Sequence, residues 1–305
     1  MGIHRQFFGE CDLQLMTDLL VSIRSPDQMA EYPSPTDIRE ALSLNEIKEN
    51  TRLWFDADGQ CVGFAFVDNY HNLRFEYDPE EVNPDIELEI VDWGEQCIRR
   101  VIKKYAEPLM LDVSCRDDDR ARIAFFERYG FVMQEVHSLH MARSLTGPIA
   151  RMKLPAGFKI RRVTGEQEVP ALVALHRSAF STDHMTIEER LAMMRVREYD
   201  PDLDLVITEP EGQLAGYCMC SISQEENKRT GSQEGSIDTI VMHPDFQRRG
   251  LAQTLLLTGL RRLKRRGLDT ALLSTSSGNI PMQRTAATVG FRKMTTTLWF
   301  AKSVK

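Results

Sequence analysis

The sequence predicts an α/β fold (α+β in some classifications) built as two related domains in tandem. A chain of 305 residues exceeds the size at which a single hydrophobic core usually stops growing. Two phrases occur in both halves in the same order, which indicates an internal duplication. In the second half, strand patterns and helix patterns alternate around a glycine turn, as expected of a mixed sheet with helices.

The first repeated phrase predicts a hairpin in each half. DADGQCVGFAFV (56–67) and EPEGQLAGYCMC (209–220) both place an acid, Gly and Gln before a second Gly and an aromatic residue. An acid-Gly turn between two apolar runs is typical of two antiparallel strands. Gly59 corresponds to Gly212 at an offset of 153 residues.

The second repeated phrase predicts a short helix that ends in Gly-Phe before a strand. It covers residues 120–136 and 280–296, and Gly130 corresponds to Gly290 at an offset of 160 residues. A glycine after the last helical turn adopts the left-handed cap conformation, and the phenylalanine then enters the core. The two offsets differ by seven residues, so the first half is the shorter one between the two phrases.

The boundary between the domains is expected in a segment rich in Gly and Pro without periodicity. We assign residues 1–147 to the first domain, 148–157 to a linker and 158–305 to the second domain. The second domain then restarts with a strand pattern. Its expected elements are a strand (158–163), a helix (166–180), a helix opened by a capping box at Thr186 and Glu189 (186–199), the hairpin (203–223), a mobile polar connection (224–235), a strand (236–244), a helix (251–267), a strand (269–277), a helix (280–290) and a strand (294–302).

Composition narrows the class of protein. The formal net charge of −7 argues against nucleic acid or an anionic membrane as the main partner. Among the six cysteines, only Cys218 and Cys220 are close in sequence, on the same side of a predicted strand. Because no second Cys/His pair has the spacing of a zinc site, we expect no metal and free thiols in a reducing compartment. The N-terminus lacks an apolar signal-peptide core and no long apolar run occurs, so we expect a cytoplasmic protein.

The turn after the strand at 236–244 is predicted to bind an anion. It reads QRRGLA (247–252) and leads directly into a helix. A helix start offers unpaired backbone N–H groups and the positive end of the helix dipole, which favour phosphate. Gly250 allows close approach of the backbone, and Ala252 keeps the next contact small. The spacing matches neither the nucleoside-triphosphate loop nor the dinucleotide fingerprint.

The pattern Q-x-x-G-x-A after a strand resembles the acetyl-CoA loop of the GNAT acetyltransferase superfamily, written [Q/R]-x-x-G-x-[G/A]. The resemblance continues at Asn279, which is followed by Gly290 and Phe291 at the family's spacing. The two motifs together cover about 60 residues. The tandem arrangement is similar to the two-domain branch that includes mycothiol synthase. The resemblance implies two domains, each with a mixed, mostly antiparallel sheet flanked by helices.

The resemblance also implies roles for named residues and acetyl-CoA as cosubstrate. The backbone of one strand would pair with the pantetheine arm and polarise the thioester carbonyl, the loop would hold the pyrophosphate, and an Asn would meet the pantetheine from the next strand. These cofactor-binding residues are Ile240, Val241, Met242, Gln247, Arg248, Arg249, Gly250, Leu251, Ala252, Gln253 and Asn279. The acceptor, a primary amine of a small molecule or peptide, would attack directly in a ternary complex.

Two departures from the family pattern concern the catalytic residues. The tyrosine that many members use as general acid is Ala286 here, which leaves water as the proton source. For the general base, the candidates are Asp238 and Glu234, which would share one strand face with Ser236 by period two. A solvated strand-edge carboxylate is the alternative for each. His243 abuts the loop and is interpreted as a turn residue, with a proton carrier that lies toward the pyrophosphate as the alternative.

In the first half, the same alignment places Glu87–Asp92 at the loop position, with three carboxylates and no glycine. The positions of the Asn and the Tyr are Asp119 and Phe126. We therefore expect a degenerate GNAT-like domain without cofactor, which takes the place of a second subunit and supports the active half.

Several alternatives stay open from the sequence. The protein is either an N-acetyltransferase or a non-catalytic acyl-CoA sensor, and transfer of a longer acyl group or transfer to a hydroxyl is a third possibility. Acidic residues either favour a cationic acceptor or belong to a solvated surface: Asp183, Glu188, Glu189, Asp202 and Asp204. The basic run at 261–266 either indicates nucleic acid or belongs to a solvated helix face, which would assist CoA's 3′-phosphate if it folds near the loop. A monomer or a homodimer is expected.

Overall fold

The computed structural model describes residues 3–25, 33–81 and 84–305. The chain divides into two compact units. Unit 1 comprises Met1–Val136 together with Thr297–Lys305, and unit 2 comprises His137–Thr296. Both have a β-sheet with helices on its faces, so the predicted α/β class of fold is confirmed.

Unit 1 is built around an antiparallel sheet in the order β1-β2-β3-β4. One face packs on the N-terminal helices through Leu53, Phe64 and Phe66, and the other face packs on α4 through Trp54 and Ala65. The elements are β1 (Ile3–Gln6), α1 (Glu10–Ile23), α2 (Pro35–Ala41), α3 (Asn45–Glu49), β2 (Thr51–Phe55), β3 (Cys61–Val67), β4 (Leu73–Tyr77), α4 (Pro84–Tyr105), β5 (Met110–Arg116), α5 (Arg120–Arg128) and β6 (Val132–Met133).

Unit 2 has the strand order β7-β12-β11-β10-β9-β8. Helices α9 and α10 pack on one face over Cys218 and Ile237, and α6 packs on the other face over Tyr217 and Val241. The elements are β7 (Ser138–Ser144), β8 (Lys159–Arg162), η2 (Glu166–Glu168), α6 (Val169–Phe180), α7 (Ile187–Arg195), η3 (Pro201–Leu203), β9 (Asp204–Thr208), β10 (Leu214–Ser221), α8 (Gln224–Thr230), β11 (Glu234–Met242), η4 (Pro244–Phe246), α9 (Leu251–Arg265), β12 (Thr270–Ser276) and α10 (Ile280–Thr288).

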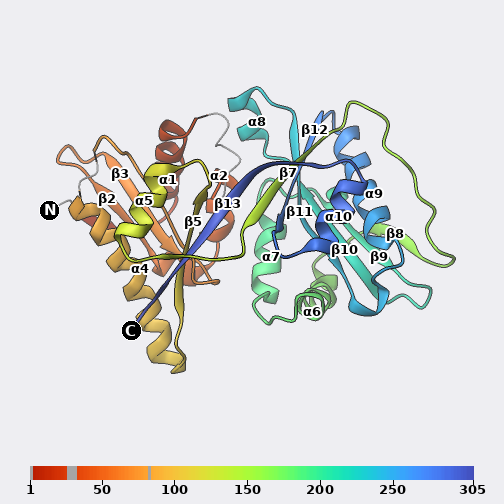
Figure 1. Ribbon diagram of the computed structural model, residues 1–305, viewed down its shortest axis with the longest axis horizontal. Helices are drawn as coiled ribbons and strands as arrows, with labels where there is room; N and C mark the ends of the chain where they lie inside the picture. Colours follow the sequence, from red (N-terminus) through yellow and green to blue (C-terminus); the bar gives the residue numbers. More distant parts are fainter. Residues whose placement is uncertain (1–2, 26–32, 82–83) are drawn as a thin grey trace. The chain divides into compact units, whose positions relative to one another are not determined.

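The two halves of the sequence exchange their last strands. The final strand β13 (Arg292–Ser303) belongs to the second half of the sequence, yet its residues 297–303 pair antiparallel with β5 in unit 1. Conversely, β7 ends the first half and pairs antiparallel with β12 in unit 2. Figure 1 shows the blue β13 beside the yellow β5, and the yellow-green β7 beside β12. The compact units therefore do not follow the division expected at residues 148–157, because each sheet is completed by a strand from the other half.

Both repeated phrases form the same local structure twice. In each hairpin turn the acid carboxylate accepts a hydrogen bond from the backbone of the Gln four residues later, at 2.7 Å for Asp56 and 3.0 Å for Glu209. After each short helix, the N–H of Phe131 or Phe291 bonds to the carbonyl five residues earlier, at 3.0 Å in both. These matching details confirm the hairpins and the Gly-Phe caps that the sequence predicts.

Two expectations about local structure are wrong. The segment at 224–230, expected as a mobile connection, is helix α8, whose cap Ser223 accepts from the N–H of Glu226. Glu87–Asp92 do not form the loop before the helix, because they lie inside α4, which begins at Pro84. β4 ends at Tyr77 and α4 begins at Pro84, and the sequence between them, DPEEVN, is also acidic and has no glycine. The linker segment 148–157 contains no helix or strand, as expected.

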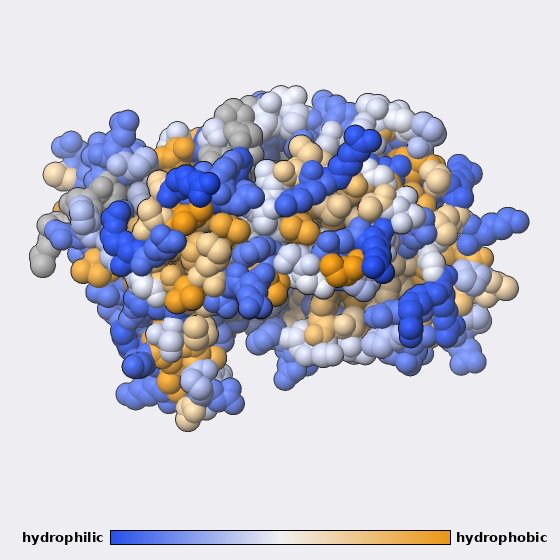
Figure 2. Space-filling view, viewed as in Figure 1, coloured by the Kyte–Doolittle hydropathy of each residue, from blue (hydrophilic) through white to orange (hydrophobic). Residues whose placement is uncertain are grey.

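No described helix is both long and apolar enough to cross a membrane. On the face drawn in Figure 2, apolar residues are interspersed among hydrophilic ones. Exposed apolar side chains of this scattered kind are normal for a folded protein surface.

Candidate active site

Strands β11 and β12 separate in the middle of unit 2. They are parallel and pair from Glu234–Thr270 to Ile237–Leu273. Both strands continue beyond that point, β11 to Met242 and β12 to Ser276, without further pairing between described residues. The result is a wedge-shaped opening, bordered by Asp238–Met242 on one side and Ser274–Ser276 on the other. Backbone groups along this edge of β11 are available to an extended ligand.

A β-bulge marks the point of the wedge. Along the β10–β11 pair, Thr239 is opposite Met219 and Ile237 is opposite Cys220, so Asp238 is the extra residue of the bulge. The strict alternation expected for β11 therefore does not hold past Ile237. Ile237 packs under α9, whereas Val241 packs on the α6 face, although both have odd numbers. Bulges of this kind redirect a strand beside active sites.

The loop after β11 presents a concave row of backbone donors. Arg248 has a φ of 58° and Gly250 a φ of 74°, both in the left-handed region. Within the described part of the chain, the N–H groups of residues 248–253 donate no backbone hydrogen bond outside helix α9, whose first turn leaves its N–H groups free. Left-handed residues that alternate with others aim successive N–H groups at one point, which is an anion-binding arrangement. A positive φ at Arg248 costs about 1 kcal/mol of conformational free energy, and strain of this kind is often found in functional loops.

The same loop has space in front of its donors. A Cβ built on Gly250 would meet only Met152, whose Cε would lie 3.8 Å away. Gln247, Arg248, Arg249 and Gly250 are exposed, and Arg249 donates to the carbonyl of Asp245 at 3.0 Å. His243, interpreted from sequence as a turn residue, accepts from the N–H of Asp245 at 3.2 Å. It also lines a cavity of about 380 Å³ with α6 and the β9–β10 turn.

Across the opening, Asn279 and Ala286 have distinct positions on α10. Asn279 caps the helix, since its Oδ1 accepts from the N–H of Met282 at 3.1 Å. Its Nδ2 has no partner among the described residues and is exposed, so it remains available to a ligand. Ala286 is fully buried in the core under α9. The position where the family places its tyrosine is therefore a packing position here.

The two candidate bases lie at different points of β11. Asp238 is exposed at the bulge, and its Oδ1 accepts from Ser221 Oγ at 3.0 Å. Glu234 is opposite Thr270 at the closed end of the strand pair, about 13 Å along the strand from Asp238. Burial, and then the nearby charge of Asp269, raise the pKa of Glu234 above its ordinary value. The structure therefore brings Asp238 to the opening, and Glu234 lies away from it.

One polar pair at the opening is missed by the sequence analysis. Ser274 is the first residue of β12 beyond the paired segment, and its Oγ lies 2.8 Å from Nδ1 of His140 on β7. His140 comes from the first half of the sequence, and it reaches this place because β7 is exchanged. No motif signals the pair, since the exchange of strands is invisible to a search for motifs within one half.

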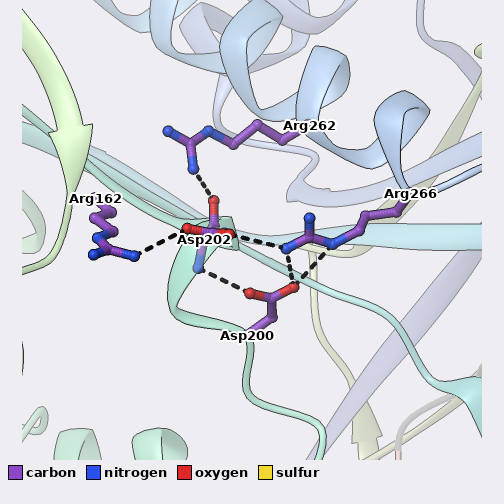
Figure 3. Close-up of polar contacts among 5 residues, drawn as sticks. All are labelled: Arg162, Asp200, Asp202, Arg262 and Arg266. Atoms are coloured by element: carbon purple, nitrogen blue, oxygen red, sulfur yellow. Dashed lines mark hydrogen bonds and ion pairs between the residues drawn. The ribbon is translucent and has the colours of Figure 1, made fainter.

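Most of the acidic residues considered as acceptor contacts are occupied by structural interactions. Asp204 is fully buried with Arg190 and Tyr199, and Glu189 closes the capping box with Thr186. Asp202 belongs to a surface cluster in which Arg266 contacts both Asp200 and Asp202, Arg162 contacts Asp202, and Arg262 donates to the backbone of Asp202 (Figure 3). Only Asp183 and Glu188 remain exposed without such a partner among the described residues.

Comparison with known proteins gives a family match in the second half of the chain and relatives that cover more of it. Residues 169–291 match the family described as "Acetyltransferase (GNAT) family". Over 273 residues the chain is 27% identical to a mycothiol acetyltransferase of Acidothermus cellulolyticus, with 83% of this chain and 80% of that protein covered. A mycothiol acetyltransferase of Saccharomonospora viridis is 26% identical over 189 residues, which cover 60% of each chain.

A solved structure shows the same fold over the whole chain. A tandem GNAT protein from the clavulanic acid biosynthesis pathway, solved without AcCoA, superposes with a TM-score of 0.72 and 16% identity, covering 100% of this chain and 99% of that one. This likeness concerns the fold alone, and it includes both units. The family match covers the strands and the loop that border the opening. The protein is thus an acetyltransferase with a GNAT domain in its second half and the fold of a tandem GNAT protein.

Proposed function

We propose that unit 2 transfers an acetyl group from acetyl-CoA to a primary amine of a small molecule or peptide, by direct attack in a ternary complex. The observation that carries this proposal is the wedge between β11 and β12, which opens beside a row of six backbone N–H donors. An extended ligand with an anionic end and an amide-containing arm fits this combination of loop and strand edge.

The residues that would bind acetyl-CoA fall into two groups. The N–H groups of residues 248–253 surround the point where a pyrophosphate would lie, and the side chains of Arg248 and Arg249 add positive charge. Val241 turns its backbone groups toward β10, so Ile240 and Met242 are the residues that offer backbone groups to the pantetheine arm at the free edge of β11. The carbonyl of Met242 also accepts a hydrogen bond from Gln247 Nε2 at 3.3 Å. Asn279 offers its free Nδ2 from α10. Acetyl-CoA supplies the acetyl group as a thioester.

Asp238 is the base that the geometry supports best. It lies at the bulge where the wedge begins, it is exposed, and Ser221 orients its carboxylate through one hydrogen bond. In the transfer, the amine nitrogen forms a bond to the acetyl carbon as the C–S bond breaks, and the nitrogen loses a proton to Asp238. Glu234, the other candidate, lies at the closed end of the strand pair.

The proton for the departing thiolate has a candidate donor in the Ser274–His140 pair. Ala286 offers no acid, since it is a buried methyl group. Ser274 is the first residue of β12 that does not pair with β11, and its hydroxyl is 2.8 Å from Nδ1 of His140, a side chain that can donate or accept a proton. The pair supplies the function that the family's tyrosine performs, with water as the alternative source.

A small-molecule acceptor is supported by the name of the relatives, mycothiol acetyltransferase. The first half of the sequence supports the site by supplying β7 to the sheet of unit 2, and we propose that it binds no cofactor itself. The six cysteines, all free thiols, support work in the cytoplasm.

An amine screen that measures CoA release tests the function. We expect turnover of acetyl-CoA with at least one small amine, and about a hundredfold lower kcat in Asp238→Asn. His140→Gln should lower kcat less, with KM for acetyl-CoA nearly unchanged. Binding of acetyl-CoA without turnover of any amine, thiol or hydroxyl acceptor would instead favour the acyl-CoA sensor.

A further inference from the structure

A second basic concavity lies along helix α9, away from the donor row of the loop. It is a pocket of about 350 Å³, lined by Arg151, Met152, Thr258, Arg261, Arg262 and Arg265. The residues from α9 recur at the three- and four-residue spacing that puts them on one face of the helix. Four of the six lining residues are arginines and none is acidic. We call it the arginine pocket.

The far wall of the pocket is the segment that connects β7 to β8. This segment is fastened along α9, because Lys264 donates to the carbonyls of Thr146 and Gly147 at 3.0 and 2.7 Å. Arg261 donates to the carbonyl of Ala150 at 2.7 Å. Arg151 and Met152 follow directly, so the fastened backbone holds an additional cation opposite the helix.

The arginines of the pocket lack carboxylate partners. Arg151 and Arg265 have no hydrogen bond or ion pair with any described residue, and Arg261 contacts only a carbonyl and the hydroxyl of Thr258. Arg262 turns to the backbone of Asp202, while the carboxylates of Asp200 and Asp202 are taken by other arginines (Figure 3). Burial, and then the charges of Arg151 and Arg265, lower the pKa of Arg261. Like charges gathered in this way are stabilised by an anion.

The pocket is adjacent to the cofactor loop through one residue. Met152 lines the pocket, and its Cε lies 3.8 Å from the position that a Cβ on residue 250 would occupy. Arg261 is ten residues along α9 from Leu251, about 15 Å by the helical rise. A ligand bound at the loop and an anion in the pocket are therefore neighbours and occupy separate positions.

We propose that the arginine pocket binds a phosphate dianion. Arginine forks suit tetrahedral oxyanions, and three unpaired or carbonyl-bound guanidinium groups converge here. The phosphate is either free inorganic phosphate or a monoester such as the 3′-phosphate of CoA. The second source rests on the proposed function, and the first is independent of it.

Calorimetric titration at constant ionic strength tests the proposal. The pocket variant is Arg151→Gln/Arg265→Gln, whose two side chains make no bond that the fold needs. The control is Arg120→Gln/Arg292→Gln, which removes the same charge from two exposed arginines elsewhere. Inorganic phosphate is titrated into each protein alone and after saturation with dephospho-CoA, and CoA is compared with dephospho-CoA.

We expect at least about a tenfold loss of affinity in the pocket variant alone, the factor for one charge-assisted hydrogen bond. If the loss concerns phosphate added on top of dephospho-CoA, the ligand is a free anion. If the loss removes a preference for CoA over dephospho-CoA, the ligand is the monoester. Equal affinities in all three proteins, or equal losses in both variants, overturn the proposal. If neither nucleotide binds, the proposed function fails, and the titrations of phosphate alone still decide the pocket.

Discussion

The pair β4–β5 in unit 1 and the pair β11–β12 in unit 2 occupy equivalent places in the repeat and differ in what fills them. In unit 2 the strands pair over four positions and then open. Among the described residues of unit 1, the parallel contact is a single bridge, Asn72–Asp112, and polar side chains follow it. Arg74 on β4 donates to Ser114 on β5 at 2.7 Å, so the separation is crossed by a hydrogen bond.

A buried network of ion pairs also lies beside β4 in unit 1. Glu76 on β4 accepts from Arg24 at 2.6 Å and from Arg122 on α5 at 2.9 Å. Burial alone would raise the pKa of Glu76, and the charges of Arg122 and Arg24 outweigh burial and hold the pKa below its ordinary value. The comparison shows that the space between the two parallel strands of this fold can either stay open to a ligand, as in unit 2, or be occupied by internal ion pairs, as in unit 1. It supports the prediction that unit 1 binds no cofactor.

The largest effect is expected at the loop of unit 2. Gly250→Glu should weaken acetyl-CoA binding about a thousandfold, roughly 4 kcal/mol, because it puts a carboxylate among the N–H donors and an L-residue at a φ of 74°. The matched control is Gly267→Glu at the other end of α9, where φ is 87° and a Cβ meets nothing within 4 Å. Equal losses of binding in the two variants would assign the effect to helix stability.

The exchange of strands predicts that a core mutation in β7 or β13 destabilises the unit in whose sheet that strand pairs. Phe300, fully buried in β13, belongs to the second half of the sequence and packs in the core of unit 1. Phe300→Ala should cost about 3.5 kcal/mol and lower the hydrogen-exchange protection of β5. Met141→Ala on β7 should instead lower the protection of β12. Loss of protection in the opposite units would contradict the exchange.

The ion network around Glu76 in unit 1 predicts a contribution to the free energy of unfolding that depends on pH. Glu76→Gln leaves two arginines without their carboxylate and should lower the free energy of unfolding by about 3 kcal/mol at pH 7. Because the folded pKa of Glu76 is depressed, its stabilisation is present above the unfolded value of about 4.3 and is lost as the pH falls through the folded pKa.

Urea unfolding of wild type and Glu76→Gln at pH 7 and at lower pH should therefore give curves that converge on acidification. The control Glu168→Gln breaks the more exposed pair with Arg161 and should cost less than about 1 kcal/mol. A difference between wild type and Glu76→Gln that stays constant with pH would exclude the charge of Glu76 as its cause.

The smallest effects are expected for the two candidate bases, and they compare Asp238 at the bulge of β11 with Glu234 at its closed end. Asp238→Asn should lower kcat about a hundredfold, roughly 2.7 kcal/mol, without much change in KM for acetyl-CoA. Glu234→Gln should change kcat only a few-fold, since Glu234 lies at the closed end of the strand pair. The reverse order would move the acceptor site to the other end of β11.

The sequence predicts what is local and misses what depends on long-range pairing. The hairpin turns at Gly59 and Gly212 and the Gly-Phe caps follow from backbone requirements within a few residues, and the structure confirms them. The loop at Gln247–Ala252 is equally local. The bulge at Asp238 could not be predicted, because Ile240, Val241 and Met242 are consecutive apolar residues and do not reveal that the alternation of faces changes after Ile237.

The exchange of β7 and β13 could not be predicted from the sequence because it also depends on long-range pairing. The two strands are equivalent by repeat, so either could complete either sheet, and the partner is decided by packing across more than a hundred residues. This exchange brings His140 to Ser274 and places a residue of the first half at the candidate site of the second. The alignment of Glu87–Asp92 to the loop failed because α4 has 22 residues and α9 has 15. An offset taken from the Gly-Phe caps after these helices therefore places the loop position seven residues too far along the chain, inside α4.

The central claim is that one of two similar units keeps a working opening, and the stoichiometry of acetyl-CoA binding tests it most directly. Calorimetric titration of acetyl-CoA into the wild-type protein should give one site per chain, located in unit 2. Two sites would contradict the claim, because the ion-paired opening of unit 1 would then also accept the ligand. No binding at all would contradict the assignment of the loop and the wedge as a cofactor site.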